Sequence, residues 1–155
     1  MLFLVKDAAA QDIDPDYKHY IDSLYIKHSS HISPSEVAAM KNVYILDARE
    51  EEEFAVSHLK NARNIGYIWF DMRRIYDIPL DGEVVIYCTA GWRSERIAER
   101  LQKAGYTHIY NLYGGIFEWI NEGYPVYRSN GTQTTEIHTY TASLAHWVNR
   151  GTKVH

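Results

Sequence analysis

The chain has 155 residues, enough for one domain with short additions, and 46% of them are apolar, which indicates a folded core rather than a disordered polypeptide. Its net charge of −4, without a block rich in Lys and Arg, argues against a nucleic-acid partner. The sequence contains no run of about 18 apolar residues, so we expect no membrane span, and its single cysteine excludes an internal disulfide.

Residues 1–31 form a polar and aromatic N-terminal extension. Within it, apolar residues recur at spacings of three and four, which predicts a short amphipathic helix with a face able to dock: Tyr17, Tyr20, Ile21, Leu24 and Tyr25. The apolar start Met1–Val5 is too short for the core of a signal peptide. Together with the unpaired thiol, this favours the cytoplasm, with the periplasm open if a leader was removed.

Residues 32–127 alternate between helical and strand patterns. Ser33 and Glu36 form a capping box that predicts a helix over about 34–41. The further elements follow in chain order: strand 43–47, helix 50–58, strand 62–65, helix 68–76, strand 83–87, helix 93–103, strand 108–112 and helix 116–122. This alternation predicts an α/β domain with a parallel sheet and helices on both faces. Residues 128–155 form a polar C-terminal extension with one predicted helix around Leu144, Trp147 and Val148.

The clearest strand, residues 83–87, ends directly before Cys88. Ligands of open α/β sheets bind beyond the carboxyl ends of strands. The loop after Cys88 leads into a helix, whose first N–H groups and positive field suit an anion and favour thiolate over thiol. Gly91 lets the backbone curl, Arg93 supplies a cation, and Ser94 can hydrogen-bond to the sulfur. A lone cysteine is usually a packing residue, but this setting predicts a nucleophile.

The stretch Cys88–Arg93 resembles the active-site loop of the rhodanese family, whose pattern is Cys, any two residues, Gly, any residue and Arg. Other family motifs follow in the same order over about residues 32–125: Leu46-Asp47-Ala48-Arg49, Glu53-Phe54, Ser57-His58-Leu59, Ala62–Ile65, and Leu112-Tyr113-Gly114-Gly115 with Trp119. The resemblance implies a rhodanese-like fold with a central parallel sheet of about five strands. It also implies a sulfurtransferase that moves a sulfane sulfur from thiosulfate or a protein persulfide to a thiol or other nucleophilic acceptor, through a persulfide on Cys88. The substrate-binding loop would comprise Thr89, Ala90, Gly91, Trp92, Arg93 and Ser94.

Five further residues are interpreted as structural support rather than as catalytic groups: Asp47, Arg49, His58, Gly114 and Gly115. An Asp at a strand end holds a neighbouring loop through backbone amides, and Arg49 pairs with a nearby carboxylate. The two glycines suit a close backbone approach near the active-site loop, since the Lys-Ser/Thr of a phosphate loop does not follow them. His28 and His31 lack the further ligands of a structural zinc site, so we expect neither a metal nor an organic cofactor.

Two loop positions leave alternatives open. Thr89 stands where many thiosulfate-using family members carry Arg, so persulfide donors remain open. Trp92 at the pocket mouth either contacts a partner protein or packs against a neighbouring loop. A Cys/Arg-loop phosphatase is one rival function, although those loops place five residues between Cys and Arg and this loop places four. The other rival is a non-catalytic binding module, although inactive family members generally lack the cysteine.

Overall fold

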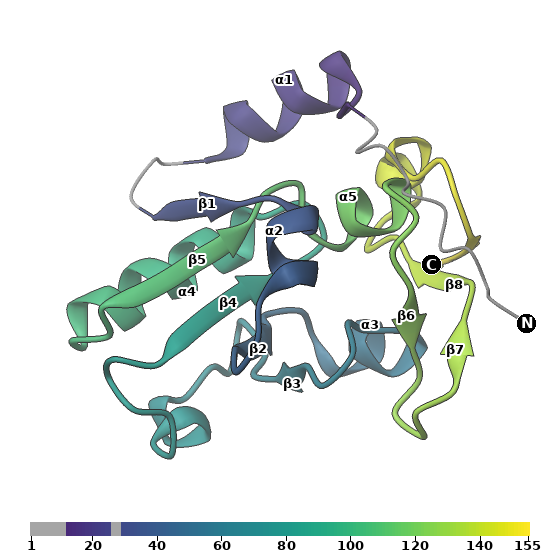
Figure 1. Cartoon of the computed structure of the whole chain (residues 1–155). Helices are drawn as coiled ribbons and strands as arrows, with labels where there is room; N and C mark the ends of the chain where they lie inside the picture. The colour runs from purple at the N-terminus through teal and green to yellow at the C-terminus, as the bar shows by residue number, and fades with distance from the viewer. Residues whose placement is uncertain (1–11, 26–28) are drawn as a thin grey trace, which may run out of the picture.

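A five-stranded parallel sheet forms the centre of the protein in the computed structural model, which describes residues 12–25 and 29–155. The strands lie in the order β1-β5-β4-β2-β3 (Figure 1). Their bounds are β1 Ser30–Ile32, β2 Tyr44–Asp47, β3 Arg63–Asn64, β4 Glu83–Tyr87 and β5 His108–Leu112. The predicted α/β class with about five parallel strands is therefore confirmed.

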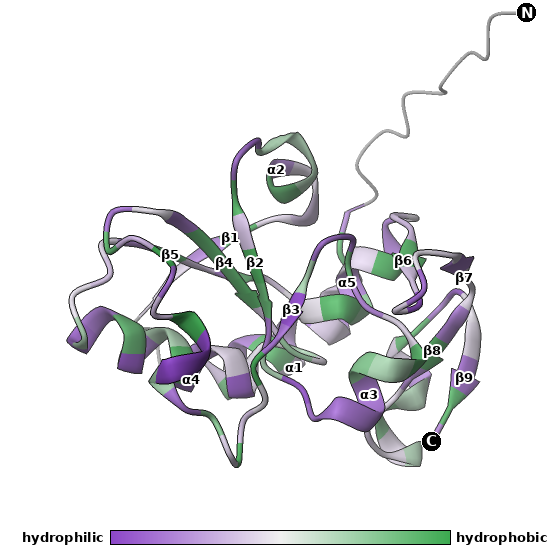
Figure 2. Cartoon of the chain, turned by 90° about the horizontal axis from the view of Figure 1, so that it is seen from below, coloured by the Kyte–Doolittle hydropathy of each residue, from purple (hydrophilic) through white to green (hydrophobic). Residues whose placement is uncertain are grey.

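The helices are α1 Pro15–Leu24, α2 Pro34–Ala39, α3 Glu51–Val56, α4 Trp92–Lys103 and α5 Gly115–Asn121, with 3₁₀ turns η1 Met72–Ile75 and η2 Ala142–Trp147. Figures 1 and 2 place α2 and α4 on opposite faces of the sheet. The capping box predicted from Ser33 and Glu36 is present at the start of α2. Within the described part of the chain, no helix combines the length and the apolarity needed to cross a bilayer.

Strand β4 is apolar on both sides because the sheet is covered on both faces. Val84 and Ile86 belong to one buried cluster, together with Ile97 and Leu101 of α4. Val85 belongs to a second cluster, which includes residues of α1, α2 and α5. Figure 2 accordingly draws β4 in the hydrophobic colour. Cys88, the next residue after β4, continues the side that faces α4.

The predicted helix over residues 68–76 is wrong for its first half. Only η1 forms there, capped by the side chain of Asp71, which accepts the N–H of Arg73 at 2.9 Å. Ile68 and Trp69 are 69% and 81% exposed. The buried apolar residues of this stretch, Phe70 and Ile75, are five positions apart, which does not place them on one face of an α-helix, and packing of such a face supplies most helical stability. The helix predicted around Leu144–Val148 is likewise a 3₁₀ turn, η2.

Both extensions pack against the sheet domain. Tyr17 and Ile21, on the apolar face of α1, are buried in the chain's own core, and the rings of Tyr17 and Tyr20 each lie 5.3 Å from that of Trp147. The C-terminal extension follows β6 Val126–Tyr127 and contains three short strands: β7 Gln133–Thr134, β8 Glu136–His138 and β9 Thr152–Val154. The domain boundaries after residues 31 and 127 stay predictions. Met1–Val5 and His28, used in the sequence arguments, lie outside the described residues.

Candidate active site

Cys88, directly after the carboxyl end of β4, lines a pocket of about 230 Å³. The thiol-bearing residue is 2% exposed. The pocket wall includes four residues of the active-site loop and four from the two extensions: Thr89, Ala90, Trp92, Arg93, Tyr20, Leu24, Tyr140 and Leu144. Five of these eight carry aromatic or aliphatic side chains longer than a methyl group, so the wall around Cys88 is largely apolar.

The loop curls back so that its backbone reaches the sulfur. Gly91 has φ +104°, a conformation that favours glycine, and its N–H lies 3.1 Å from Cys88 Sγ. A methyl group on Gly91 would also lie 2.1 Å from the hydroxyl oxygen of Tyr25. The hydroxyl of Ser94 lies 3.4 Å from Cys88 Sγ, but it lies closer, at 2.7 Å, to Asn111 Oδ1. The Ser94 hydroxyl has a single proton, and its shorter contact is with Asn111. The Gly91 N–H is therefore the stronger hydrogen bond to the sulfur.

Arg93 forms a buried, bidentate ion pair with Glu53 of α3. Its two terminal nitrogens donate to the Glu53 carboxylate at 2.7 and 2.8 Å. Burial alone would lower the pKa of the Arg93 guanidinium, but the hydrogen bonds to Glu53 outweigh it and the pKa is raised. Burial alone would raise the pKa of Glu53, but hydrogen bonding to Arg93 and the Arg93 charge hold it below its usual range. Both side chains are therefore charged, and Arg93 already has its counter-ion.

Thr89 and Tyr140 complete the surroundings of this ion pair. The Thr89 hydroxyl accepts an N–H of Arg93 at 2.9 Å and lies 3.2 Å from Glu53 Oε1. The ring of Tyr140 covers the guanidinium, with its centroid 4.6 Å from the central carbon of Arg93. Tyr140 holds this position with φ +66°, which a non-glycine residue rarely adopts. Arg93 is thus covered on the pocket side as well as paired.

A polar cluster behind the loop fixes the start of α4. Asn111 of β5 donates to the Gly91 carbonyl at 3.0 Å and to the Glu95 carboxylate at 2.8 Å. Burial alone would raise the pKa of Glu95, but hydrogen bonds from His31, Ser29 and Asn111 lower it to about 2. A fully buried Asn in an otherwise apolar strand is stable only when its amide is paired, and here the amide holds the loop in register with the sheet.

Gly114 and Gly115 lie where the loop after β5 meets the active-site loop. A methyl group on Gly115 would lie 2.3 Å from the Thr89 carbonyl oxygen and 2.5 Å from that of Cys88. This close approach allows the next residue, Ile116, to donate its N–H to the Cys88 carbonyl at 2.9 Å. The Tyr25 hydroxyl connects both loops, since it accepts the Gly114 N–H at 3.0 Å and donates to the Ala90 carbonyl at 2.9 Å.

Asp47, Arg49 and His58 lie away from the sulfur. Asp47 accepts the backbone N–H of Arg49 at 2.9 Å and its guanidinium N–H at 2.6 Å, and both side chains are fully buried. Arg49 also donates to the Ser57 carbonyl at 2.7 Å. A ring nitrogen of His58 lies 2.9 Å from the Phe54 carbonyl, and its backbone pairs with Tyr127. None of the three lines the pocket that holds Cys88.

Trp92 stands at the mouth of the pocket and is 38% exposed. Its ring lies 5.6 Å from that of Tyr67 and 4.0 Å from the guanidinium of Arg96. The side chain therefore packs against a neighbouring loop and still presents part of its surface beside the pocket.

Most residues that contact the active-site loop from other helices and strands were not predicted from the sequence. Glu53 appeared only as part of a family motif, although a buried arginine requires a carboxylate somewhere in the fold. Asn111 carried a usable signal, because a polar residue inside an apolar strand needs a partner. No sequence pattern indicated that residues of the two extensions would line the pocket around Cys88. Among the described residues, no group of three or more His, Cys, Asp or Glu side chains could hold a metal ion.

Comparisons with known proteins agree with this geometry. Residues 33–122 match the model of the rhodanese-like domain family. The chain is 39% identical over 82 residues to the uncharacterized protein YqhL of Bacillus subtilis, covering 53% of this chain and 64% of YqhL. It is 33% identical over 95 residues to a protein named sulfurtransferase from Allochromatium vinosum, covering 61% of this chain and 88% of that protein.

A solved structure of a rhodanese-related protein from Thermoplasma volcanium superposes with a TM-score of 0.56 at 30% identity, covering 63% of this chain and 97% of that one. Other relatives bear a different name: a tRNA uridine(34) hydroxylase of Cytophaga hutchinsonii is 35% identical over 101 residues, covering 57% of this chain but 31% of that protein.

The parallel sheet, the cysteine loop at the end of β4 and the family match define the class of protein. The chain belongs to the rhodanese-like domain family.

Proposed function

We propose that this protein is a sulfurtransferase that accepts a sulfane sulfur on Cys88 from a persulfide donor and passes it to a thiol. The observation that carries the proposal is that Cys88 lines a pocket and that the Gly91 N–H lies 3.1 Å from its Sγ. A preorganised N–H donor stabilises negative charge on sulfur as that charge develops.

The reaction has two displacement steps. The Cys88 thiolate attacks the outer sulfur of the donor, the donor's S–S bond breaks, and the rest of the donor leaves as a thiolate that takes up a proton. Cys88 now carries the outer sulfur as a persulfide. In the second step an acceptor thiolate attacks that outer sulfur, the S–S bond to Cys88 breaks, and the Cys88 thiolate returns. The outer sulfur is transferred at constant overall oxidation state, so the reaction needs no external oxidant or reductant.

The charge of the pocket favours a persulfide over thiosulfate as the donor. Among the described residues that line the pocket, Arg93 is the one cation, and Glu53 and Tyr140 already engage it. A divalent anion that entered this largely apolar pocket would lose its hydration without gaining a counter-ion. An organic persulfide whose organic part is uncharged carries at most one negative charge, and that organic part can contact side chains such as Leu24 and Leu144. We therefore propose that Arg93 shapes the loop and does not bind the donor directly.

A phosphate dianion needs charged donors, and the one cation among the described lining residues, Arg93, is already engaged by Glu53 and Tyr140. The pocket is therefore poorly suited to a phosphatase. A non-catalytic binding module would not require a loop that directs a backbone N–H at a buried thiol. We propose the cytoplasm as the compartment, because the reaction requires Cys88 to be kept reduced.

The donor comparison tests the proposal. Sulfur transfer to a small thiol acceptor is measured with benzyl persulfide, whose organic part is uncharged, and with thiosulfate, and we expect kcat/KM to be at least roughly tenfold higher for the persulfide. Cys88→Ser should abolish transfer from both donors. Thr89→Arg adds a cation to the pocket wall and should raise kcat/KM for thiosulfate, whereas the uncharged control Thr89→Val should not. A wild-type preference for thiosulfate would contradict the donor assignment, and phosphate release from an aryl phosphate would favour the phosphatase.

A further inference from the structure

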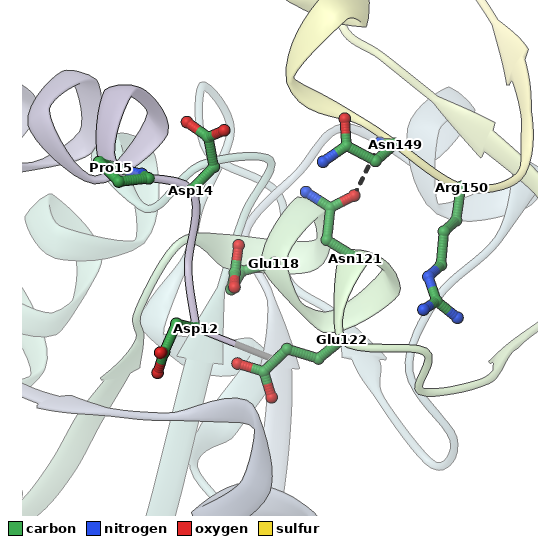
Figure 3. A pocket seen from close by; sticks show the side chains of 8 residues that line it. All are labelled: Asp12, Asp14, Pro15, Glu118, Asn121, Glu122, Asn149 and Arg150. Atoms are coloured by element: carbon green, nitrogen blue, oxygen red, sulfur yellow. Dashed lines mark hydrogen bonds between the residues drawn. The ribbon is translucent and has the colours of Figure 1, made fainter. Parts of the chain in front are cut away.

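A second pocket, of about 360 Å³, lies away from Cys88 where three distant parts of the chain meet (Figure 3). The start of α1, the end of α5 and the segment after η2 contribute to it. Four of its lining residues are acidic: Asp12, Asp14, Glu118 and Glu122. Among the described lining residues, Arg150 is the one that carries a positive charge. Nothing in the proposed sulfur transfer uses this pocket.

Glu118 distinguishes the pocket from an ordinary acidic surface. The residue is 4% exposed. Across residues 12–25 and 29–155, its carboxylate takes part in no hydrogen bond or ion pair, in contrast to Asn121, which donates to the Trp147 carbonyl at 2.8 Å. Figure 3 shows the Glu118 side chain between those of Asp12, Asp14 and Glu122. Buried carboxylates are normally paired, so an unpaired one that opens into a pocket points to a missing cationic partner.

The charges around Glu118 support the same view. Burial raises its pKa to about 7, and the negative charges of Glu122 and Asp14 add to the effect. Burial raises the pKa values of Tyr17, from α1, and Tyr113, which follows β5, and the negative charge of Glu118 adds to both shifts, so these two phenols also lie near Glu118. The fold therefore holds Glu118 where its ionised form is disfavoured until positive charge arrives.

We propose that this pocket binds a primary alkylammonium group, with Glu118 as its buried counter-ion. An ammonium group presents three N–H donors, and Glu118 and Glu122 both line the pocket with carboxylates that can accept them, whereas the Asp14 carboxylate accepts N–H groups at the start of α1. The ring of Pro15 offers an apolar wall for an alkyl stem. Among the described residues, no group of three or more His, Cys, Asp or Glu side chains could hold a metal ion, so the proposal names an organic cation. A free diamine and a lysine side chain share this chemistry.

Calorimetric titration of the full chain with 1,4-diaminobutane tests the proposal. We expect the probe to bind, Glu118→Gln to weaken binding at least roughly tenfold, and the exposed control Glu52→Gln to leave the affinity unchanged. A cation favours ionised Glu118, so binding releases a proton when Glu118 starts protonated. The affinity should therefore rise between about pH 6 and pH 8, and buffers with different ionisation heats should reveal proton release in the wild type but not in Glu118→Gln.

A second titration identifies the source of the ammonium group. An acetylated and amidated Gly-Lys-Gly peptide replaces the diamine, and tighter binding of the peptide would assign the pocket to a lysine side chain. Absence of binding by both probes would overturn the proposal, as would equal weakening by Glu118→Gln and Glu52→Gln, which indicates general attraction to an acidic surface. Persulfide formation on Cys88, measured on Glu118→Gln, should be unchanged, so this proposal and the proposed sulfur transfer fail independently.

Discussion

At the residue scale, the ion pair between Arg93 and Glu53 changes the role that the loop pattern predicted for Arg93. The sequence predicted a cation at this position for an anionic substrate. The structure pairs that cation with a carboxylate 40 residues earlier in the chain. The arginine therefore fixes the loop to α3, and the Gly91 N–H lies 3.1 Å from Cys88 Sγ.

Glu53→Gln should destabilise the fold strongly. The substitution removes the counter-charge of Arg93, which is 6% exposed, and an unpaired buried charge costs about 3–5 kcal/mol. Chemical denaturation measures the loss. Asp71→Asn is the matched control, because it removes the carboxylate of an exposed ion pair with Arg73, and it should leave the unfolding midpoint unchanged. Equal midpoints for the two variants would contradict a structural role for the Glu53–Arg93 pair.

The parts of the site that the sequence could predict are those close to Cys88 in the chain. Gly91 and Arg93 belong to one contiguous loop, so their spacing could be interpreted directly. Glu53, Asn111 and Tyr25 reach the same loop from α3, from β5 and from the segment after α1. Their contributions depend on how the sheet orders its strands, which no local pattern contains.

At the element scale, the meeting of α5 with the active-site loop is the tightest backbone contact of the site. Gly115→Ala should cost about 2–4 kcal/mol, because its φ is +62° and the new methyl group would lie 2.3 Å from the Thr89 carbonyl oxygen. Gly131→Ala is the control, since Gly131 also has positive φ, +84°, but its new methyl group would have no neighbour within 4 Å. That control should cost only about 1–2 kcal/mol in chemical denaturation. Equal losses in the free energy of unfolding for the two variants would contradict a contribution of the close approach to stability.

The elements that the sequence predicted best are those whose pattern decides their packing. The bounds of β4 and β5 agree with the predicted strands 83–87 and 108–112. The continuous apolar run of β4 suits a strand buried on both faces, whereas β5 includes the buried polar Asn111. The apolar residues of the predicted helix over 68–76 do not share one buried helix face, since Phe70 and Ile75 are buried whereas Ile68 and Trp69 are exposed. Trp69, at 81% exposed, illustrates that apolar spacing alone does not establish a buried face.

At the scale of the whole molecule, both extensions contribute to the pocket around Cys88. Tyr20 and Leu24 come from α1, and Tyr140 and Leu144 come from the C-terminal extension. Residues 33–122, which match the family model, therefore form only part of the wall. The sequence placed these segments outside the domain, and nothing in their composition indicated that they would meet beside the thiol.

The central claim is that Cys88 carries the transferred sulfur, and the intact mass of the full chain tests it most directly. The protein is incubated with glutathione persulfide, freed of excess donor and weighed by mass spectrometry before and after addition of a thiol. We predict a gain of one sulfur atom on the wild type, its loss after the thiol is added, and no gain on Cys88→Ser. The absence of any gain on the wild type, or an equal gain on Cys88→Ser, would contradict the account.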